Sequence, residues 1–284
     1  EATGQLGYID GSLVVRTDKT PLPVKVGLVD TAVVLVGTGV DISAAALAAA
    51  AEYGASVVVC DWKTEPVAAL SPWSTHTRVG ARQRAQLTAS APQRKRVWAE
   101  IIKSKVSGQA WVLRTQGHPD AQALKAMSDA VSSGDASNIE GAAAAFYWRR
   151  FGSGIVRDRS AGDPLNSALN YGYTVLRSRA INAVVAAGLH PGIGVFHHYH
   201  SNPFALADDV MEPFRPAVDA AVHELGAALD MELPETRKAL VAASTAPMGN
   251  VQMTVVSELN RMCQSIGMFF EDKTSQLHMP VWRG

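Results

Sequence analysis

The heptapeptide Ser71-Pro-Trp-Ser-Thr-His-Thr77 separates two kinds of sequence. Before it, apolar residues stand in short β-branched runs such as 32–36, bounded by glycine and aspartate, which is typical of strands. After it, apolar residues recur at helical spacing, as in 97–106, and few β-rich runs remain. We therefore predict an α+β fold, with a small β-rich N-terminal domain over residues 1–74 and a larger all-helical C-terminal domain over residues 75–284.

Local signals add detail to both domains. Asp10-Gly11 is a good hairpin turn, and Asp41 is predicted to cap a helix over residues 42–53 that Gly54 closes. Because a β-rich domain with exposed strand edges often pairs with a second copy, we expect the first domain to be a dimerisation surface. The second domain is predicted to hold helices over residues 78–89, 93–114, 119–131, 138–151, 165–188, 205–231, 234–244 and 251–271.

Composition limits the class of protein. The chain has 284 residues, of which 47% are hydrophobic and 18% charged, enough apolar material for a real core. No apolar run reaches the ~18 residues that span a bilayer, so we expect no membrane partner. The two cysteines, Cys60 and Cys263, lie far apart and are interpreted as buried thiols in a reducing compartment.

The charge is unevenly distributed along the chain. The formal net charge is zero, yet residues 76–160 hold fourteen basic and six acidic side chains. Such a basic middle is a possible phosphate footprint. A solvated, arginine-rich helical face explains it equally well, and composition alone does not separate the two.

The segment His197-His198-Tyr-His200-Ser-Asn202-Pro203 places three histidines ahead of a helix start. Asn202-Pro203 is a sound helix N-terminal signal, because proline is tolerated in the first turn. Histidines in this position can cap or fill a turn, or they can bind a metal ion, and the segment by itself leaves both open.

Acidic residues follow on the predicted helix. Asp209 and Glu212 are three residues apart and are expected to share a face, whereas Asp208 points elsewhere. A carboxylate pair with a nearby imidazole suits Mg²⁺ or Mn²⁺ rather than zinc, since no thiol is close by in the sequence. The alternative is that acids in a first turn only favour the helix macrodipole. Pro213 and Pro216 are expected to kink this helix.

Three motifs follow one another along the chain. The first is Asn138-Ile-Glu-Gly-Ala-Ala143, the second Asp163-Pro-Leu-Asn-Ser-Ala-Leu-Asn-Tyr-Gly-Tyr173, and the third Leu206-Ala-Asp-Asp-Val-Met-Glu-Pro-Phe-Arg-Pro-Ala-Val-Asp219. In this order they resemble the motifs of the CRISPR spacer-acquisition integrase family. In that family a metal-binding histidine precedes the motif glutamate by fifteen residues, which selects His197 here, and a shift of one residue would select the adjacent His198 instead. The Leu169-Asn-Tyr-Gly-Tyr173 segment looks closest to type II members, whose systems use a single large RNA-guided effector nuclease.

The resemblance implies an activity and a site. Family members join the 3′-hydroxyl ends of captured spacer DNA to repeat ends by transesterification, with an associated endonuclease activity. Carried over, the catalytic and metal-binding residues are Glu140, His197 and Glu212, with Mg²⁺ or Mn²⁺ as cofactor. Asp209 and His198 are possible accessory residues.

The resemblance also implies partners. The expected ones are double-stranded DNA (spacer precursor and repeat array), a second copy in a homodimer, and a small ferredoxin-like CRISPR-associated protein that completes a heterohexamer. The effector nuclease is a further candidate, and the expected location is the prokaryotic cytoplasm. DNA-backbone contacts are expected from basic side chains of the middle segment, namely Arg78, Arg82, Arg84, Arg149, Arg150, Arg157 and Arg159.

Two other functions remain open at this point. The same acids and histidine serve a metal-dependent nuclease that acts on branched DNA without integration, because water can attack in place of a sugar hydroxyl. The chain can also be a non-catalytic DNA-binding subunit whose acids are structural. The size of the DNA products distinguishes such a nuclease from an integrase, because joined and cleaved strands differ in length. Absence of turnover would favour the non-catalytic subunit.

Overall fold

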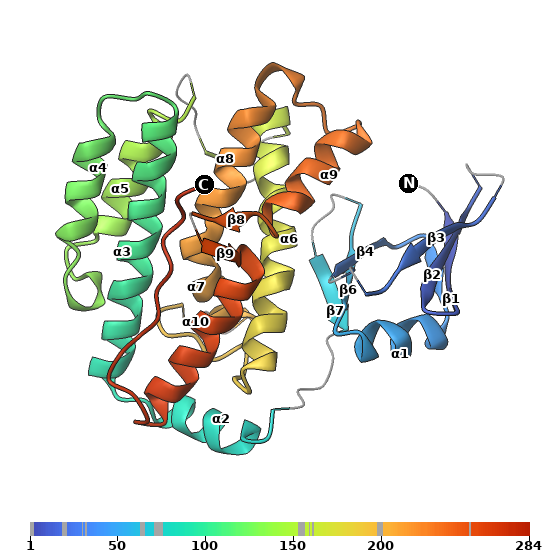
Figure 1. Cartoon of the computed structure of the whole chain (residues 1–284), viewed down its shortest axis with the longest axis horizontal. Helices are drawn as coiled ribbons and strands as arrows, with labels where there is room; N and C mark the ends of the chain where they lie inside the picture. Colours follow the sequence, from blue (N-terminus) through green and yellow to red (C-terminus); the bar gives the residue numbers. More distant parts are fainter. Residues whose placement is uncertain are drawn as a thin grey trace. The chain divides into compact units, whose positions relative to one another are not determined.

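The structure is a computed structural model (Figure 1), and it divides into two compact units, Glu1–Thr75 and His76–Gly284. Strands dominate the first unit and helices the second, which confirms the predicted α+β class. The residues that the structure describes are 3–18, 22–29, 31, 33–62, 66–70, 76–152, 157–158, 160, 162–197, 201–249 and 251–284.

Two small sheets and one helix are formed by the described residues of the first unit. Asp10 and Gly11 form the predicted two-residue turn, with positive φ at both (47° and 78°), and Ile9 pairs with Ser12 across it. A core that includes Leu6, Leu28 and Val36 lies beneath. The strands are β1 (Gly4–Ile9), β2 (Ser12–Thr17), β3 (Val24–Gly27) and β5 (Val40–Ile42), in the order β3-β2-β1-β5, and β4 (Val33–Gly37), β6 (Ser56–Cys60) and β7 (Pro66–Leu70), in the order β4-β6-β7.

Helix α1 (Ala44–Glu52) begins two residues later than predicted, so the prediction that Asp41 caps it was wrong. Asp41 instead belongs to β5, which pairs in parallel with β1 and so continues the extended backbone past this point. The hydroxyl of Ser43 accepts a hydrogen bond from the N–H of Ala46 and caps the helix. Gly54 follows the helix with a φ of 73°, the left-handed conformation expected of a glycine that closes a helix.

The second unit is built on long helices. The predicted helices from 78–89 to 165–188 agree with α2 to α6 within three residues at each end. The α-helices are α2 (Val79–Thr88), α3 (Ala91–Thr115), α4 (Ala121–Asp129), α5 (Ile139–Trp148), α6 (Pro164–Ala186), α7 (Ala205–Met211), α8 (Arg215–Leu225), α9 (Pro234–Ala243) and α10 (Val255–Phe270), with 3-10 turns η1 (Ser133–Asp135), η2 (Glu212–Phe214) and η3 (Gly226–Ala228).

The unit is not all helical, because β8 (Pro247–Met248) and β9 (Val251–Thr254) form a hairpin. The helix predicted over 251–271 therefore starts only at residue 255. Thr254 and Ser257 explain the start, since each side chain accepts a hydrogen bond from the other's backbone N–H in a capping box.

The single helix predicted over residues 205–231 is interrupted, as its prolines led us to expect. Between α7 and α8 the backbone tightens into η2, which contains Pro213, and Pro216 lies in the first turn of α8. Proline lacks the N–H that an unbroken helix would use here. The helix then ends at Leu225, because Gly226 takes a positive φ of 48°.

Close packing fixes the inner helices of this unit. Gly172 of α6 faces Val218 of α8 so closely that a Cβ would clash with the valine side chain. The segment that follows α10 runs beside α3 (Figure 1), where Arg96 donates to the carbonyl of Ser275 and Ser104 donates to that of Pro280. Among residues with a described position, no helix has both the length and the apolar character needed to cross a bilayer.

Candidate metal and DNA site

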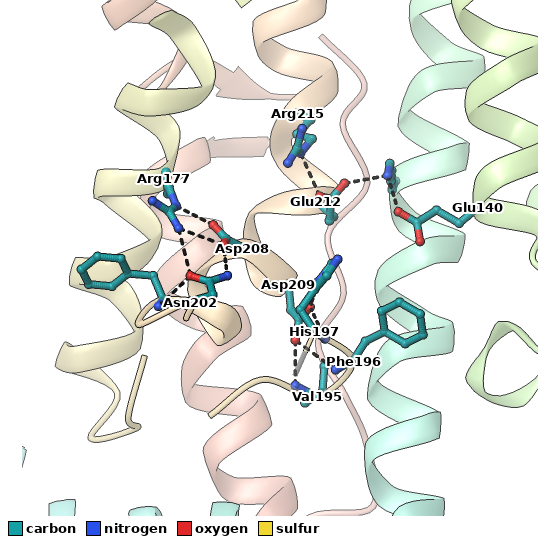
Figure 2. Close-up of polar contacts among 12 residues, drawn as sticks. Glu140, Arg177, Val195, Phe196, His197, Asn202, Asp208, Asp209, Glu212 and Arg215 are labelled. Atoms are coloured by element: carbon teal, nitrogen blue, oxygen red, sulfur yellow. Dashed lines mark hydrogen bonds and ion pairs between the residues drawn. The ribbon is translucent and has the colours of Figure 1, made fainter. Parts of the chain in front are cut away.

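Two carboxylates from different elements share one ammonium group. Lys105 of α3 places its Nζ 2.8 Å from Glu140 Oε1 and 2.7 Å from Glu212 Oε2. The Lys105 side chain is 10% exposed and that of Glu212 6%, while Glu140 is 23% exposed. Figure 2 shows Glu140 and Glu212 facing each other from α5 and η2. A cation is thus held between the two acids that the sequence selected.

Helix α5 starts in a way that fixes Glu140. The carboxylate of Asp135 accepts hydrogen bonds from the N–H groups of Ile139 (2.8 Å) and Glu140 (2.9 Å), and the Asn138 side chain accepts from Gly141. These bonds satisfy donors that a helix N-terminus leaves unpaired. Glu140 therefore projects from the first turn of a capped helix.

Glu212 has a cation on each oxygen. Arg215 Nε lies 2.9 Å from Glu212 Oε1, and the Arg215 guanidinium also covers the Tyr173 ring at 4.7 Å. Burial acts to raise the pKa of Glu212, but Arg215 and Lys105 outweigh it and lower that pKa. For Lys105, burial acts to lower the pKa, and Glu212 and Glu140 outweigh it and raise it. Glu212 and Lys105 are therefore charged at neutral pH.

His197 is oriented by a buried carboxylate. Its Nδ1 lies 2.6 Å from Oδ1 of the fully buried Asp209, whose other oxygen accepts from the N–H groups of Val195 (2.7 Å) and Phe196 (3.1 Å). This hydrogen bond raises the pKa of His197 against the effect of burial, while burial raises the pKa of Asp209. The Trp98 ring meets the His197 ring edge-on, with centroids 5.7 Å apart. The imidazole is held on several sides.

The three acids of α7 and η2 take different directions (Figure 2). Asp208 pairs with Arg177, with Nε and Oδ1 2.6 Å apart, and also accepts from Asn202. Asp209 turns back to the His197 loop, and Glu212 turns to Lys105. Asp208 thus points away as expected, while Asp209 and Glu212 contact different partners, the His197 loop and Lys105.

Only some of the site residues predicted from the sequence are seen around the Lys105 cluster. Glu140, His197 and Glu212 lie around it, whereas His198 and His200 lie outside the described residues. Within the described part of the chain, no three His, Cys, Asp or Glu side chains are grouped closely enough to hold a metal ion as they stand. The reason lies in the contacts above: Lys105 stands between the carboxylates, and His197 Nδ1 is bonded to Asp209.

The arginines of the expected DNA track divide by burial. Arg82 is buried, and its guanidinium donates to the carbonyl of Ala187 and to Gln264, so we remove it from the track as a structural residue. Arg84 is exposed, and Arg78 is exposed while paired with Glu271 at 2.6 Å.

The second arginine group follows α5. Arg149 is exposed, whereas Arg150 is half-buried, pairs with Asp120 at 2.6 Å and covers the Phe146 ring. Arg157 donates to Asn166 and Asn170. Arg159 lies outside the described residues. Arg84 and Arg149 are thus exposed members of the track, and no ion pair is seen for either of them among the described residues.

Sequence reasoning missed Lys105. The signal was present, because Lys105 follows Ile101 by four residues and Ile102 by three, which places a cation on the buried face of α3. A charged side chain on an apolar helix face needs a partner. The partners come from residues 140 and 212, which nothing in the local pattern connects to α3.

A second missed cluster joins α5, α6 and α8. Asp219 is fully buried and accepts hydrogen bonds from the hydroxyls of Tyr147 (3.0 Å) and Tyr173. Burial raises the pKa of Asp219 to about 6, against the effect of both tyrosines and of Arg215. The cluster ties the Glu140 helix to the helix that follows Glu212.

This pKa predicts how stability changes with pH. The ordinary pKa of the Asp219 carboxyl is 3.8, so between pH 4 and 6 the folded state binds more protons than the unfolded chain. The contribution of Asp219 to stability therefore falls as pH rises through this window, by about 2–3 kcal/mol. In Asp219→Asn this dependence is absent. Urea unfolding at pH 4.5 and 7.5 is expected to give a stability gap between wild type and variant that narrows at the higher pH; a constant gap would contradict the assignment.

Comparison with known proteins identifies the family of the chain. A sequence model of the family described as "CRISPR associated protein Cas1" matches residues 2–232. The "CRISPR-associated endonuclease Cas1" of Neisseria meningitidis serogroup C (strain 8013) is 37% identical over 186 residues. That match covers 65% of this chain and 60% of the relative, so the chain spans less than two thirds of that protein's length.

Solved structures share the fold. "Casposase bound to integration product" superposes with a TM-score of 0.80 at 20% identity, covering 98% of this chain and 90% of that one. A chain of the "Cas6-RT-Cas1--Cas2 complex" gives 0.76 at 18% identity, covering 99% of this chain and 35% of that one. At these identities the likeness concerns the fold. Since the family match extends over most of the sequence, the chain belongs to the CRISPR associated protein Cas1 family.

Proposed function

We propose that this chain is a metal-dependent DNA integrase of CRISPR adaptation, with an associated DNA endonuclease activity. Family membership supports the role, as does the endonuclease name of the meningococcal relative. The observation that carries the proposal is the cation held between Glu140 and Glu212, with His197 anchored beside them by Asp209.

The donor set fits Mg²⁺ or Mn²⁺. Glu140 and Glu212 would supply hard carboxylate oxygens, and His197 would supply Nε2, because Nδ1 is engaged by Asp209. The two carboxylates already hold one cation in Lys105, which supports their suitability for another. When bound, the metal ion would lower the pKa of an attacking hydroxyl and offset charge on the leaving oxygen.

The surrounding side chains prepare this site for transesterification. Asp209 fixes the His197 ring and keeps Nδ1 as the engaged nitrogen, so the ring cannot rotate freely. Arg215 keeps Glu212 ionised by pairing with its other oxygen. In the proposed reaction the 3′-hydroxyl of the spacer forms a new bond to a repeat phosphorus, and the bond to the adjoining repeat 3′-oxygen breaks. One phosphodiester replaces another, and the repeat strand is left with a 3′-hydroxyl.

DNA and protein partners are also part of the proposal. Exposed Arg78, Arg84 and Arg149, with Arg150 and Arg157, would contact DNA phosphates along the basic segment. Spacer precursor and repeat array are the proposed DNA. A small ferredoxin-like protein is the proposed partner in a heterohexamer, supported by the solved complex that pairs a protein of this fold with Cas2.

The N-terminal unit is proposed as the dimerisation domain. Strand β3 is at the edge of its sheet, and all four of its residues are exposed. Val24 and Val26 are 50% and 41% exposed there. An uncovered apolar edge strand favours pairing with a second copy.

A strand-joining assay tests the function. Labelled duplex with free 3′-hydroxyl ends is mixed with a supercoiled repeat-bearing plasmid, the partner protein and Mn²⁺, with and without excess chelator. We expect label to join the plasmid only when metal is present. Cleaved products without joined ones would replace the integrase by a nuclease acting on branched DNA. Joining that survives the chelator would overturn the metal-dependent mechanism.

A further inference from the structure

Lys105 is a nearly buried lysine with two carboxylate partners. Its Nζ contacts one oxygen each of Glu140 and Glu212, at 2.8 and 2.7 Å, and its side chain is 10% exposed. The two acids come from α5 and η2, and Lys105 from α3, so one ammonium joins three elements. The oxygens that it occupies are the ones that a metal ion would need.

The site contains two cationic side chains, and only Lys105 lies between the two carboxylates. Arg215 pairs with the far oxygen of Glu212 and lies over the Tyr173 ring, so it has a second anchor. Lys105 has the two carboxylates as its anchors, on a flexible four-carbon stem. A divalent ion placed between the same oxygens would repel an ammonium that stayed there. Lys105 is therefore the group that must leave.

We propose that Lys105 is a displaceable internal cation. In the metal-free protein its single positive charge offsets part of the charge of Glu140 and Glu212 and keeps the two carboxylates facing each other, and it leaves when the metal ion binds. It thereby competes with the metal and sets the metal affinity of the site. This inference rests on the proposed metal site. It predicts that removing the lysine raises the affinity for the metal ion, which removal of an ordinary structural ion pair would not do.

Mn²⁺ binding to the DNA-free protein tests the competition. Free Mn²⁺ is followed by electron paramagnetic resonance in wild type, Lys105→Met and Lys105→Gln. Removing the competing charge is expected to lower the Kd for Mn²⁺ about tenfold or more. Lys103→Met is the matched control, since Lys103 lies on the same helix but pairs with Glu100 and is 38% exposed. Its Kd is expected to stay within about twofold of wild type, because exposed charges are screened.

Melting temperatures give a second, independent readout. Without metal, Lys105→Met is expected to melt below wild type, because Glu140 and Glu212 then face each other without their shared cation. Saturating Mn²⁺ is expected to close that gap, because the variant binds the ion more tightly and its folded state is therefore stabilised more than that of wild type. Lys105→Gln keeps an N–H donor and guards against loss of the fold in the methionine variant.

The outcomes separate the two levels of the argument. Equal or weaker Mn²⁺ binding in both Lys105 variants, with normal binding in wild type, would overturn the displacement and leave the integrase intact. A flat titration in wild type and in every variant would overturn the metal site itself, and the inference with it. Tighter binding in both Lys105 variants, but not in Lys103→Met, is the supporting result.

Discussion

Strand joining is expected to fall by about 10³-fold or more in Glu140→Ala, because the variant loses one of two carboxylate ligands for the proposed metal ion. Its stability is expected to stay within about 1 kcal/mol of wild type. Glu140 is 23% exposed, and Lys105 keeps its second carboxylate partner in Glu212. Joining is measured on a gel with the labelled duplex and repeat-bearing plasmid, and stability by urea unfolding.

The control for this variant is Glu224→Ala. Glu224 is an exposed residue of α8 and lies outside the cluster around Lys105. The Glu224→Ala substitution removes the same chemical group from the same unit and is expected to leave strand joining unchanged. Retained joining in Glu140→Ala would refute the assignment of Glu140, whereas equal loss in both variants would point to a general effect of charge on DNA binding.

Glu212→Gln is expected to lose both activity and stability. The carboxylate of Glu212 is almost fully buried, with Lys105 on one oxygen and Arg215 on the other. Glutamine keeps the shape but loses the charge, and its NH₂ group must face one of the two cations. Removing one partner of a buried ion pair typically costs about 3 kcal/mol or more, so the urea midpoint should fall clearly below that of Glu140→Ala.

Comparing the two glutamate variants makes the result specific. Both are expected to abolish joining, but only the Glu212 variant should also unfold early. Glu212→Asp, which retains the charge, is expected to recover part of the lost stability while joining stays impaired. If Glu212→Gln proved as stable as wild type, the two buried ion pairs around it would contribute nothing, and the electrostatic account of the site would be wrong.

The fold class followed from local patterns because the two units differ in hydrophobic period. The Asp10-Gly11 turn and the break at Pro213 were predictable for the same reason, since each depends on the backbone preferences of its own residues. The start of α1 was not, because pairing with β1 carried Asp41 into a strand. Nor was the β8–β9 hairpin, whose short strands give too weak a period to compete with the helix that follows.

The candidate site was predictable in its acids and histidine, which stand in recognisable motifs. What the sequence did not predict were contacts between distant residues. Arg82 looked like a surface cation, yet its partners at Ala187 and Gln264 are more than a hundred residues away. Lys105 belongs to the same category, since its two acids come from other elements. Such long-range pairing is set by tertiary packing and leaves little trace in local spacing.

The prolines around η2 have a consequence for the entropy of folding. Pro213 and Pro216 have a restricted φ in the unfolded chain as well as in the folded one. The unfolded ensemble of this segment is therefore smaller, which typically reduces the free-energy cost of ordering by about 0.4–1 kcal/mol for each proline whose native backbone is compatible. Glu212 lies beside the first of them and Arg215 beside the second. The backbone that presents this ion pair is thus already partly restricted before the chain folds.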